Sequence, residues 1–439
     1  MKTLFKNAQI VSSDKIVTKD VLVHDRVIEK IANTIDTGAD HEYDLTGKYL
    51  IPGCIDAHVH FRTPGYEKKE DWASGSKAAL AGGFTTVFDM PNTKPKTTTI
   101  KALQAKRDII RGDTLVNFGL FFGAQLDNLH ECEKAQGIVG FKVYMGATTG
   151  HMIQEEMDRS EELLEHMFKN FNNIVAVHAE DESLMKDHAD TYKGDHTPEV
   201  HSLIRSDEIA FTAARKAIHL AKKYEGRMHL CHMSTKKEVQ LMDKFGSDKI
   251  TCEVSPHHLF LKIKDYVKLG NYIKVNPPVR GQHDQDVLWD AISKKTVNII
   301  ASDHAPHLSE EKERDYWEAP SGIPEIETTL PLMLNTVNED GLNLRDIVDL
   351  LCESPARLFG LLNKGRIEEG FDADLTVIDM DLSRTVSNSS LYTKCGWSPY
   401  DGWKLKGWPV MTFVRGRLGM ENGKIVETKG LHGKEVEIA

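Results

Sequence analysis

The chain has 439 residues, of which 40% are hydrophobic and 28% charged, and its net charge is -11. This acidic balance argues against general nucleic-acid binding, which needs a basic surface, although a local arginine or metal ion can still attract a small anion. No apolar run reaches the roughly 18 residues of a membrane span, and the N-terminus lacks the apolar core of a secretory signal. We therefore expect a soluble cytoplasmic protein that binds neither nucleic acid nor membranes, with its six cysteines reduced.

Both ends of the chain have the same character, because short apolar runs alternate there with turn residues. This pattern holds in residues 1–50 and again in two later stretches, 365–381 and 410–427. Short strands separated by turns are typical of β structure. We therefore predict a small β-sandwich domain formed by both chain termini, composed of residues 1–50 and 366–439, and a separate domain over residues 51–365.

The middle of the chain alternates eight apolar runs with stretches of helical pattern. Buried parallel strands are near-continuous apolar runs, and helices usually connect them. Eight such units over about 300 residues predict the α/β class and, within it, a (β/α)8 TIM-like barrel. An open doubly wound sheet is the alternative, but no GxGxxG motif follows the first run. The eight runs are LIPGCIDAHVHF (50–61), GFTTVFDMP (83–91), LVNFGLFFG (115–123), IVGFKVYMG (138–146), NIVAVHAED (173–181), RMHLCHMS (227–234), KITCEVSPHH (249–258) and NIIASDHAPH (298–307).

The first apolar run leads into the sequence DAHVHFRTPG (56–65), which contains the pair His58 and His60. In a strand, residues i and i+2 point to the same face, so both imidazoles can face inward. Two imidazoles at this spacing suit one divalent metal ion. A pair of structural histidines is the alternative interpretation of the same spacing.

Three further candidate ligands end other apolar runs: His178 the fifth, His232 the sixth and Asp303 the eighth. In a barrel, the C-terminal ends of the strands form the active-site face, so these side chains would meet the histidine pair there. Imidazole and carboxylate groups are common ligands of divalent metals. The combination predicts a metal centre. His229 and His304 fall on the opposite strand faces, and we expect them to be structural.

Lys142 ends the fourth apolar run. An ammonium group cannot ligate a metal, because it has donors but no lone pair. A lysine beside two divalent cations would lose its proton, and its neutral amine could take up carbon dioxide as a carbamate that bridges two metals. A buried lysine paired with a carboxylate is the alternative, and the residues alone do not decide between the two.

The motifs around these residues resemble the amidohydrolase superfamily and, within its cyclic amidase branch, the dihydroorotases. The resemblance runs from about Gly47 to Asp381, which is most of the chain. Its specific pieces are DAHVHFRTPG, GGFTTVFDMPNT (82–93), FKVYMGATTG (141–150), VHAED (177–181), CHMST (231–235), VSPHHL (254–259), VNPPVR (275–280) and ASDHAPH (301–307).

The resemblance implies a binuclear centre with two Zn2+ ions per subunit, in which one histidine pair holds each ion. Lys142 resembles the lysine whose carbamate, as N6-carboxylysine, bridges the ions. Asp303 resembles the catalytic aspartate that ligates metal and shuttles the proton. Some members bridge with an aspartate after the fourth strand instead, but this chain has ATTGHM there (147–152), which favours Lys142. The expected ligands are His58 and His60 for the first ion, His178 and His232 for the second, and Lys142 and Asp303.

A set of four polar residues resembles the substrate contacts of the family: Arg62, Asn92, Asn276 and His307. Arg62 lies two residues beyond His60 on the same expected strand edge, and a guanidinium binds a carboxylate in bidentate fashion. Allantoinases and hydantoinases resemble the chain less at Arg62 and Asn92, and their substrates lack the same carboxylate. Thr148 and Thr149 resemble a loop that closes over substrate.

The resemblance implies zinc-dependent, reversible hydrolysis of (S)-dihydroorotate to N-carbamoyl-L-aspartate, a step of de novo pyrimidine (UMP) biosynthesis. The expected partner is this small-molecule substrate. The sequence does not decide whether the protein forms a homodimer. One alternative is a related cyclic amidase, such as allantoinase or dihydropyrimidinase (hydantoinase), and Arg62 and Asn92 count against it. Another is a non-catalytic dihydroorotase-like assembly subunit, against which the retained HxH pair counts.

Two features leave their alternatives open. The charged stretch 308–327 either covers the mouth of the site or is a solvated excursion without a role. Cys231 and Glu253 lie near strand ends, where a third metal held together with His178 is conceivable. Cys231 is more typical of a small buried hydrophobic residue.

Overall fold

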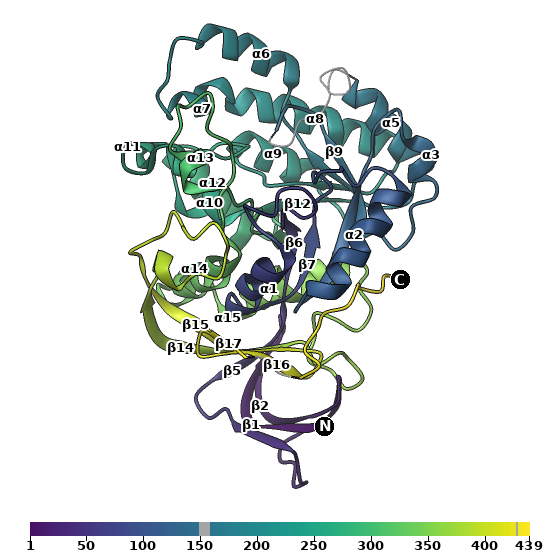
Figure 1. Ribbon diagram of the computed structural model, residues 1–439, viewed down its shortest axis with the longest axis vertical. Helices are drawn as coiled ribbons and strands as arrows, with labels where there is room; N and C mark the ends of the chain where they lie inside the picture. Colours follow the sequence, from purple (N-terminus) through teal and green to yellow (C-terminus); the bar gives the residue numbers. More distant parts are fainter. Residues whose placement is uncertain (149–158, 427–428) are drawn as a thin grey trace.

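Eight parallel strands form the central barrel of the computed structural model, which describes residues 1–148, 159–426 and 429–439 (Figure 1). The strands follow one another around the sheet in chain order. A parallel bridge between Val59 and His304 joins the first strand to the segment after the last, which closes the barrel. The strands are β6 Cys54–Val59, β7 Phe84–Asp89, β8 Asn117–Gly123, β9 Gly140–Tyr144, β10 Val175–His178, β11 Met228–Leu230, β12 Ile250–Val254 and β13 Ile299–Ile300.

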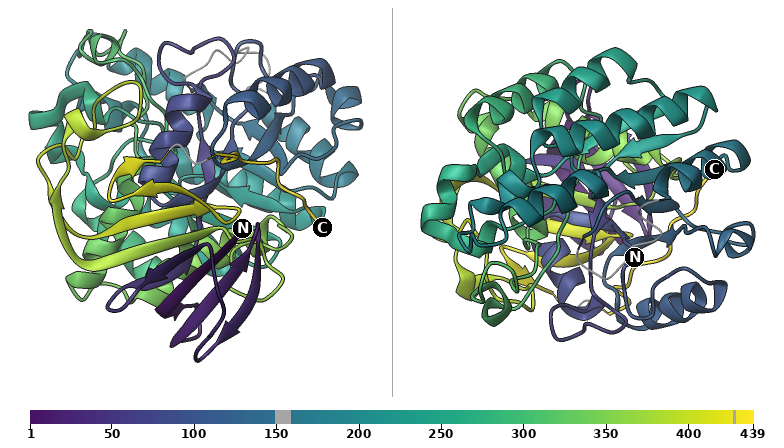
Figure 2. Two further views of the ribbon diagram at one scale, coloured as in Figure 1. Left: turned by 60° about the horizontal axis from the view of Figure 1, so that its bottom comes forward. Right: turned by 90° about the horizontal axis from the view of Figure 1, so that it is seen from above.

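Helices surround the barrel between successive strands (Figure 2). Their apolar stripes face inward: α8 buries Ile209, Ala213 and Ala217 at a spacing of four residues. Several helices begin at capping residues that can be recognised in the sequence. In α9, for example, Thr235 and Glu238 form a capping box. The α-helices are α1 Trp72–Ala81, α2 Ile100–Asp113, α3 Leu129–Cys132, α5 Ser160–Asn170, α6 Glu182–Thr191, α7 Val200–Ile204, α8 Asp207–Lys223, α9 Lys236–Phe245, α10 Pro256–Phe260, α11 Tyr266–Leu269, α12 Gln282–Ser293, α13 Ser309–Lys312, α14 Ile326–Asn338, α15 Leu344–Val348 and α16 Ser354–Leu358. The short helical turns are η1 Ile263–Asp265, η2 Gly270–Ile273, η3 Asp349–Glu353 and η4 Asn388–Ser390.

A second, mixed sheet combines strands from both ends of the chain (Figure 2). Its link is β5, which pairs in parallel with β1 from the N-terminal part and antiparallel with β14 from the C-terminal part. The strands are β1 Lys2–Val11, β2 Ile16–His24, β3 Val27–Ala32, β4 His41–Asp44, β5 Tyr49–Pro52, β14 Leu375–Thr385, β15 Lys404–Val414, β16 Arg417–Glu421 and β17 Lys424–Ile425.

The predicted fold class is confirmed: a (β/α)8 barrel is joined to a small β structure made by both termini. The open doubly wound sheet is therefore excluded. The division into residues 1–50 with 366–439 and residues 51–365 stays a prediction. Among the residues that the structure describes, no helix has the length and apolarity needed to cross a membrane.

Candidate active site and metal centre

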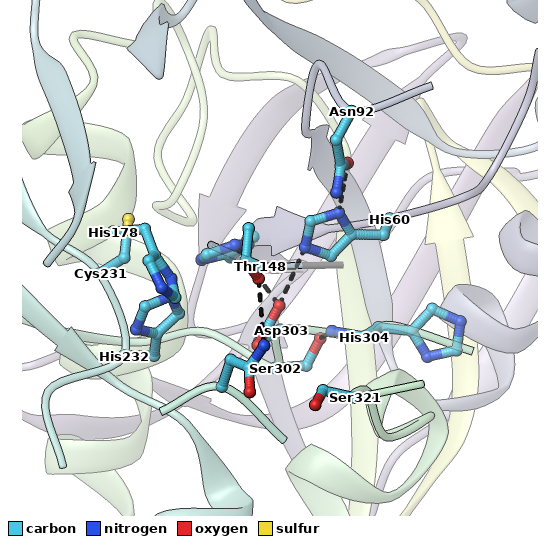
Figure 3. Close-up of polar contacts among 12 residues, drawn as sticks. His60, Asn92, Thr148, His178, Cys231, His232, Ser302, Asp303, His304 and Ser321 are labelled. Carbon is cyan, nitrogen blue, oxygen red and sulfur yellow. Dashed lines mark hydrogen bonds and ion pairs between the residues drawn. The ribbon is translucent and has the colours of Figure 1, made fainter. Parts of the chain in front are cut away.

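One buried pocket lies at the C-terminal ends of the barrel strands and collects most of the predicted site residues (Figure 3). His58 lies in β6 and His178 ends β10, while His232 and Asp303 follow β11 and β13. The residues that line the pocket are His58, His60, Arg62, Asn92, Lys142, Tyr144, Thr148, His178, His232, Val275, Asn276, Asp303, Ala305, Ser321 and Gly322.

Strand alternation explains the direction of only some of these side chains. Because β6 ends at Val59, His60 and Arg62 lie beyond the strand, and the expectation that Arg62 shares its edge was wrong. Arg62, His232 and Asp303 instead adopt positive φ angles of 63°, 36° and 48°. L-residues rarely adopt this conformation, and such strain concentrates at functional sites. Left-handed turns just beyond the strands therefore aim these side chains.

His58, His60 and Asp303 form one cluster of potential metal ligands, with one atom from each within 4.8 Å of the others. Asp303 Oδ1 lies 3.0 Å from His60 Nε2 and 3.4 Å from His58 Nε2. The remaining ring nitrogens face supporting groups: His58 Nδ1 lies 2.5 Å from Glu253 Oε1, and His60 Nδ1 lies 2.8 Å from Asn92 Oδ1. Such outer partners fix the ring orientation of metal-binding histidines, so the arrangement fits a divalent ion.

His178 and His232 form the second predicted pair, and their nearest ring nitrogens, His178 Nδ1 and His232 Nε2, are 3.0 Å apart. The other nitrogen of His178 lies 3.0 Å from Glu180 Oε2, which also binds the guanidinium of Arg205. His232 Nδ1 is buried without a hydrogen-bond partner in the described parts of the chain. The two facing ring nitrogens could both contact one cation, and among the described residues no third His, Cys, Asp or Glu ligand atom joins this pair in a compact group.

Lys142 is buried in the pocket lining, with Nζ 2.9 Å from the Cys231 sulfur and 5.2 Å from the centre of the Tyr144 ring. Within the residues that the structure describes, no carboxylate pairs with it. The alternative of an ion-paired lysine therefore has no support. A buried amine in the same pocket lining as both histidine pairs is compatible with a carbamate.

Burial and charge set the protonation of the first cluster. Burial lowers the pKa of His60 to about 4, although the adjacent Asp303 opposes that change. Burial also disfavours the charged form of His58 and is the largest single influence, but the Glu253 and Asp303 carboxylates together with Cys231 outweigh it and raise the pKa of His58 to about 10. Burial would raise the pKa of Asp303, yet His58 and His60 hold it well below its usual range. The cluster thus keeps the carboxylate of Asp303 ionised, as a metal ligand must be, whereas a divalent cation at His58 would have to displace the proton that its raised pKa retains.

Arg62 lines both the inner pocket and an outer mouth of about 440 Å³, and His307 also lines this mouth. The Arg62 guanidinium donates to Pro306 O at 3.1 Å, and its Nη2 lies 3.0 Å from His307 Nε2. His307 lines the outer mouth and is absent from the lining of the inner pocket. Thr148 lines both, whereas Thr149 lies outside the described residues.

The charged stretch 308–327 reaches the site. Ser321 and Gly322 line the inner pocket, and residues 317–321 line the outer mouth. Two buried lysines hold this segment by its backbone: Lys274 Nζ donates to two of its carbonyl oxygens, and Lys312 Nζ to two others. The stretch is therefore a wall of the mouth and not a solvated excursion.

Several residues of the site were not predicted in their observed positions. Glu253 accepts from His58, from His229 Nε2 at 3.0 Å and from the backbone N–H of His232 at 3.2 Å. It also lies with His58 and Cys231 in a second ligand-like group, but its oxygens are already engaged by these donors. His229 and His304 stay out of the pocket lining, as expected for structural residues. Tyr144 lines the pocket, and its hydroxyl has no partner in the described chain.

A closed (β/α)8 barrel with histidines and an aspartate gathered at its C-terminal strand ends defines a metal-dependent hydrolase. The sequence pattern of the amidohydrolase family matches residues 49–426, and the chain belongs to this family.

Relatives of the chain are similar over nearly its whole length. A protein named dihydroorotase from Methanosarcina mazei is 35% identical, with 98% of each chain covered. Another of that name from Pyrococcus horikoshii is 37% identical over 94% of this chain and 91% of its own. Among solved structures, an L-hydantoinase (dihydropyrimidinase) from Arthrobacter aurescens superposes with a TM-score of 0.94 at 32% identity, covering 98% of each chain.

Proposed function

We propose that this protein is a dihydroorotase that reversibly hydrolyses (S)-dihydroorotate to N-carbamoyl-L-aspartate in de novo pyrimidine biosynthesis. The observation that carries the proposal is Arg62, a buried guanidinium that faces the catalytic pocket and forms no ion pair in the described parts of the chain. A buried cation without a carboxylate is costly, and a substrate carboxylate would satisfy it. The names of the full-length relatives support the same substrate.

The proposed cofactor is a pair of Zn2+ ions. His58 and His60 would hold the first and His178 and His232 the second, with Asp303 and a carbamate on Lys142 completing the set. Bound zinc would polarise the ring carbonyl and supply a water of lowered pKa at neutral pH.

Asp303 is the proposed proton carrier of the reaction. Its carboxylate is ionised and lies in the pocket beside His58 and His60, so it is placed to accept the proton of the attacking water. The same carboxylate then delivers that proton to the ring nitrogen, which otherwise leaves poorly as an anion. Arg62 binds the substrate carboxylate, and Asn92 and Asn276, which also line the pocket, orient the ring. In the reverse direction, ring closure with loss of water uses the same groups in the opposite order.

The carbamate on Lys142 has a direct test. We expect protein equilibrated with 13C-bicarbonate to give a carbamate signal in its 13C NMR spectrum, and Lys142→Gln to lack that signal. Lys142→Gln should also retain less zinc than the wild type. Full zinc occupancy and no carbamate signal in the wild type would exclude this bridge.

One experiment separates the proposed substrate from its rivals. Purified protein is assayed side by side with dihydroorotate, N-carbamoyl-aspartate, allantoin and hydantoin, and the zinc content of the same sample is measured. We expect turnover of the first two compounds and about two zinc ions per chain. The structural similarity to a hydantoinase makes hydantoin the strongest rival, and activity on hydantoin or allantoin alone would refute the proposal. No turnover of any compound would favour a non-catalytic subunit.

A further inference from the structure

His201 is a buried histidine on the short helix α7, and both of its ring nitrogens are engaged. Its Nε2 lies 3.0 Å from Val275 O and 2.9 Å from Asn276 Oδ1, while its Nδ1 lies 2.9 Å from the Tyr316 hydroxyl. Asn276 lines the catalytic pocket, and Tyr316 belongs to the stretch 308–327. His201 itself does not line the pocket, so it reaches the site through Asn276.

The hydrogen-bond partners of His201 fix where its proton lies. A carbonyl oxygen can only accept, so the nitrogen that faces Val275 O must carry the hydrogen. Burial lowers the pKa of His201 well below its usual range, so the ring is neutral and its Nδ1 is an acceptor for the Tyr316 hydroxyl. The atom of Asn276 that faces the protonated Nε2 must therefore be the oxygen.

The amide group of Asn276 is thereby fixed in one of its two orientations. With its oxygen held by His201, its NH2 group points to the other side, where Nδ2 lies 3.5 Å from Thr148 Oγ1. Both Asn276 and Thr148 line the pocket. This wall therefore presents an N–H donor and not a carbonyl acceptor.

We propose that His201 is a positioning residue that orients the Asn276 amide as a donor, so that this wall of the pocket selects an oxygen acceptor of the substrate. The inference rests on the proposed function, because Asn276 is a substrate contact only there. A cyclic amide offers both C=O and N–H groups along its ring. An asparagine that is free to rotate could bind either a C=O or an N–H group. A fixed N–H donor can bind only a carbonyl or carboxylate oxygen, and it therefore discriminates between ring orientations.

The same histidine fastens the wall of the mouth. Lys274, which directly precedes Val275, donates to the backbone oxygens of Tyr316 and Ala319 at 2.6 Å each. Tyr316 is thus held by its hydroxyl through His201 and by its backbone through Lys274. Because the two anchors share one segment, residues 274–276, the position of the mouth wall and the orientation of Asn276 are linked.

Steady-state kinetics with dihydroorotate test the role of His201. His201→Leu is expected to raise KM about tenfold while kcat changes less than about threefold, because a fixed donor binds the substrate and the transition state alike. His201→Gln retains a side-chain donor and should recover part of that loss. Zinc content should match the wild type in both variants. A fall in kcat at unchanged KM, or a loss of zinc, would overturn the proposal.

A double-mutant cycle shows whether His201 acts through Asn276. Asn276→Ala should raise KM by a similar factor, and adding His201→Leu should then change it less than about twofold. A second tenfold rise would overturn the proposal. His257→Leu is the matched control, since His257 is a buried histidine bonded to Glu325 outside the pocket lining. It should leave KM unchanged, and a rise equal to that of His201→Leu would mean a general packing effect.

Nitrogen NMR tests the inference without any substrate. The signal of His201 is assigned by its loss from the spectrum of His201→Gln. Two-bond 1H–15N correlations should then show that the ring of His201 is neutral and protonated at Nε2. An Nδ1–H ring or an imidazolium near neutral pH would overturn the inference. If the wild type does not turn over dihydroorotate, the proposed function fails, yet this spectrum still decides the orientation of Asn276.

Discussion

The pocket has a floor, which holds the proposed metal ligands, and a rim, which holds Arg62 and Asn276. The two are built in different ways. At the floor, His58 and His178 lie in barrel strands, and each uses one ring nitrogen toward the pocket and the other toward a buried glutamate. At the rim, Arg62 and Asn276 lie on loops and are held by groups from distant segments, namely Pro306 O and His201. We expect the floor to provide chemistry that related enzymes share and the rim to decide which cyclic amide reaches it.

The comparisons with known proteins concern the whole chain and do not separate the floor from the rim. A hydantoinase superposes on the chain with a TM-score of 0.94 at 32% identity, so the barrel that carries the floor is common to both. The relatives named dihydroorotase are 35% and 37% identical, which is only slightly higher. Overall similarity therefore separates these activities poorly, and the side chains of the rim must be tested one by one.

The largest effect is expected from the floor. Asp303→Ala removes the proposed proton carrier and should lower kcat about 10³-fold in both reaction directions. The far-ultraviolet circular dichroism and melting temperature should stay close to those of the wild type, because Asp303 lies beyond the strand and not in the core. Asp303→Asn, which keeps the shape, should be equally inactive. Near-normal turnover in either variant would remove Asp303 from the mechanism.

A smaller effect is expected at Glu253, which contacts the floor residue His58. Glu253→Gln keeps an acceptor for His58 but removes the charge, and we expect the zinc affinity of the metal-free protein to fall about 10- to 100-fold. Competition with a chelator measures this affinity directly. Glu70→Gln is the matched control, since Glu70 is also fully buried but contacts Thr393 and His304, neither of which is a proposed ligand. Equal affinities in the two variants would contradict the supporting role of Glu253.

The smallest effect is expected at the outer support of the rim. Trp397, in the segment between β14 and β15, donates from its indole to His307 O at 2.7 Å. Trp397→Phe loses this one hydrogen bond, and we expect KM for dihydroorotate to rise less than about threefold with kcat unchanged. Michaelis–Menten analysis of both parameters checks this. A drop in kcat would show that the floor and the rim are not separable here.

The positions of the floor residues could be predicted from the sequence because the ends of regular strands carry them, although left-handed turns set the final direction of His232 and Asp303. The HxH spacing and the C-terminal ends of parallel strands are readable from apolar runs, so His178, His232 and Asp303 fell where they were expected. The strands themselves are shorter than their runs: the last, β13, has only 2 residues. Positive φ angles beyond the strands could not be foreseen from alternation, which is why the direction of Arg62 was attributed to the wrong cause.

The supporting groups could not be predicted, because their partners are far apart in the chain. Glu253 and His58 are separated by 195 residues, and Tyr316 and His201 by 115. No periodicity links such positions, and their contacts depend on loop paths that only the folded chain defines. Glu253 had a visible signal, a carboxylate in an otherwise apolar run, but that signal alone did not distinguish a ligand from a support.

The most direct test of the division between floor and rim is the ratio of kcat/KM for dihydroorotate to kcat/KM for hydantoin, measured in the wild type and in Arg62→Met. Arg62→Met removes the guanidinium that would bind the substrate carboxylate while leaving the metal ligands in place. We expect this ratio to strongly favour dihydroorotate in the wild type and to fall at least about 100-fold in the variant, with zinc content unchanged. A ratio that stays the same in Arg62→Met, or a wild type that prefers hydantoin, would contradict the account.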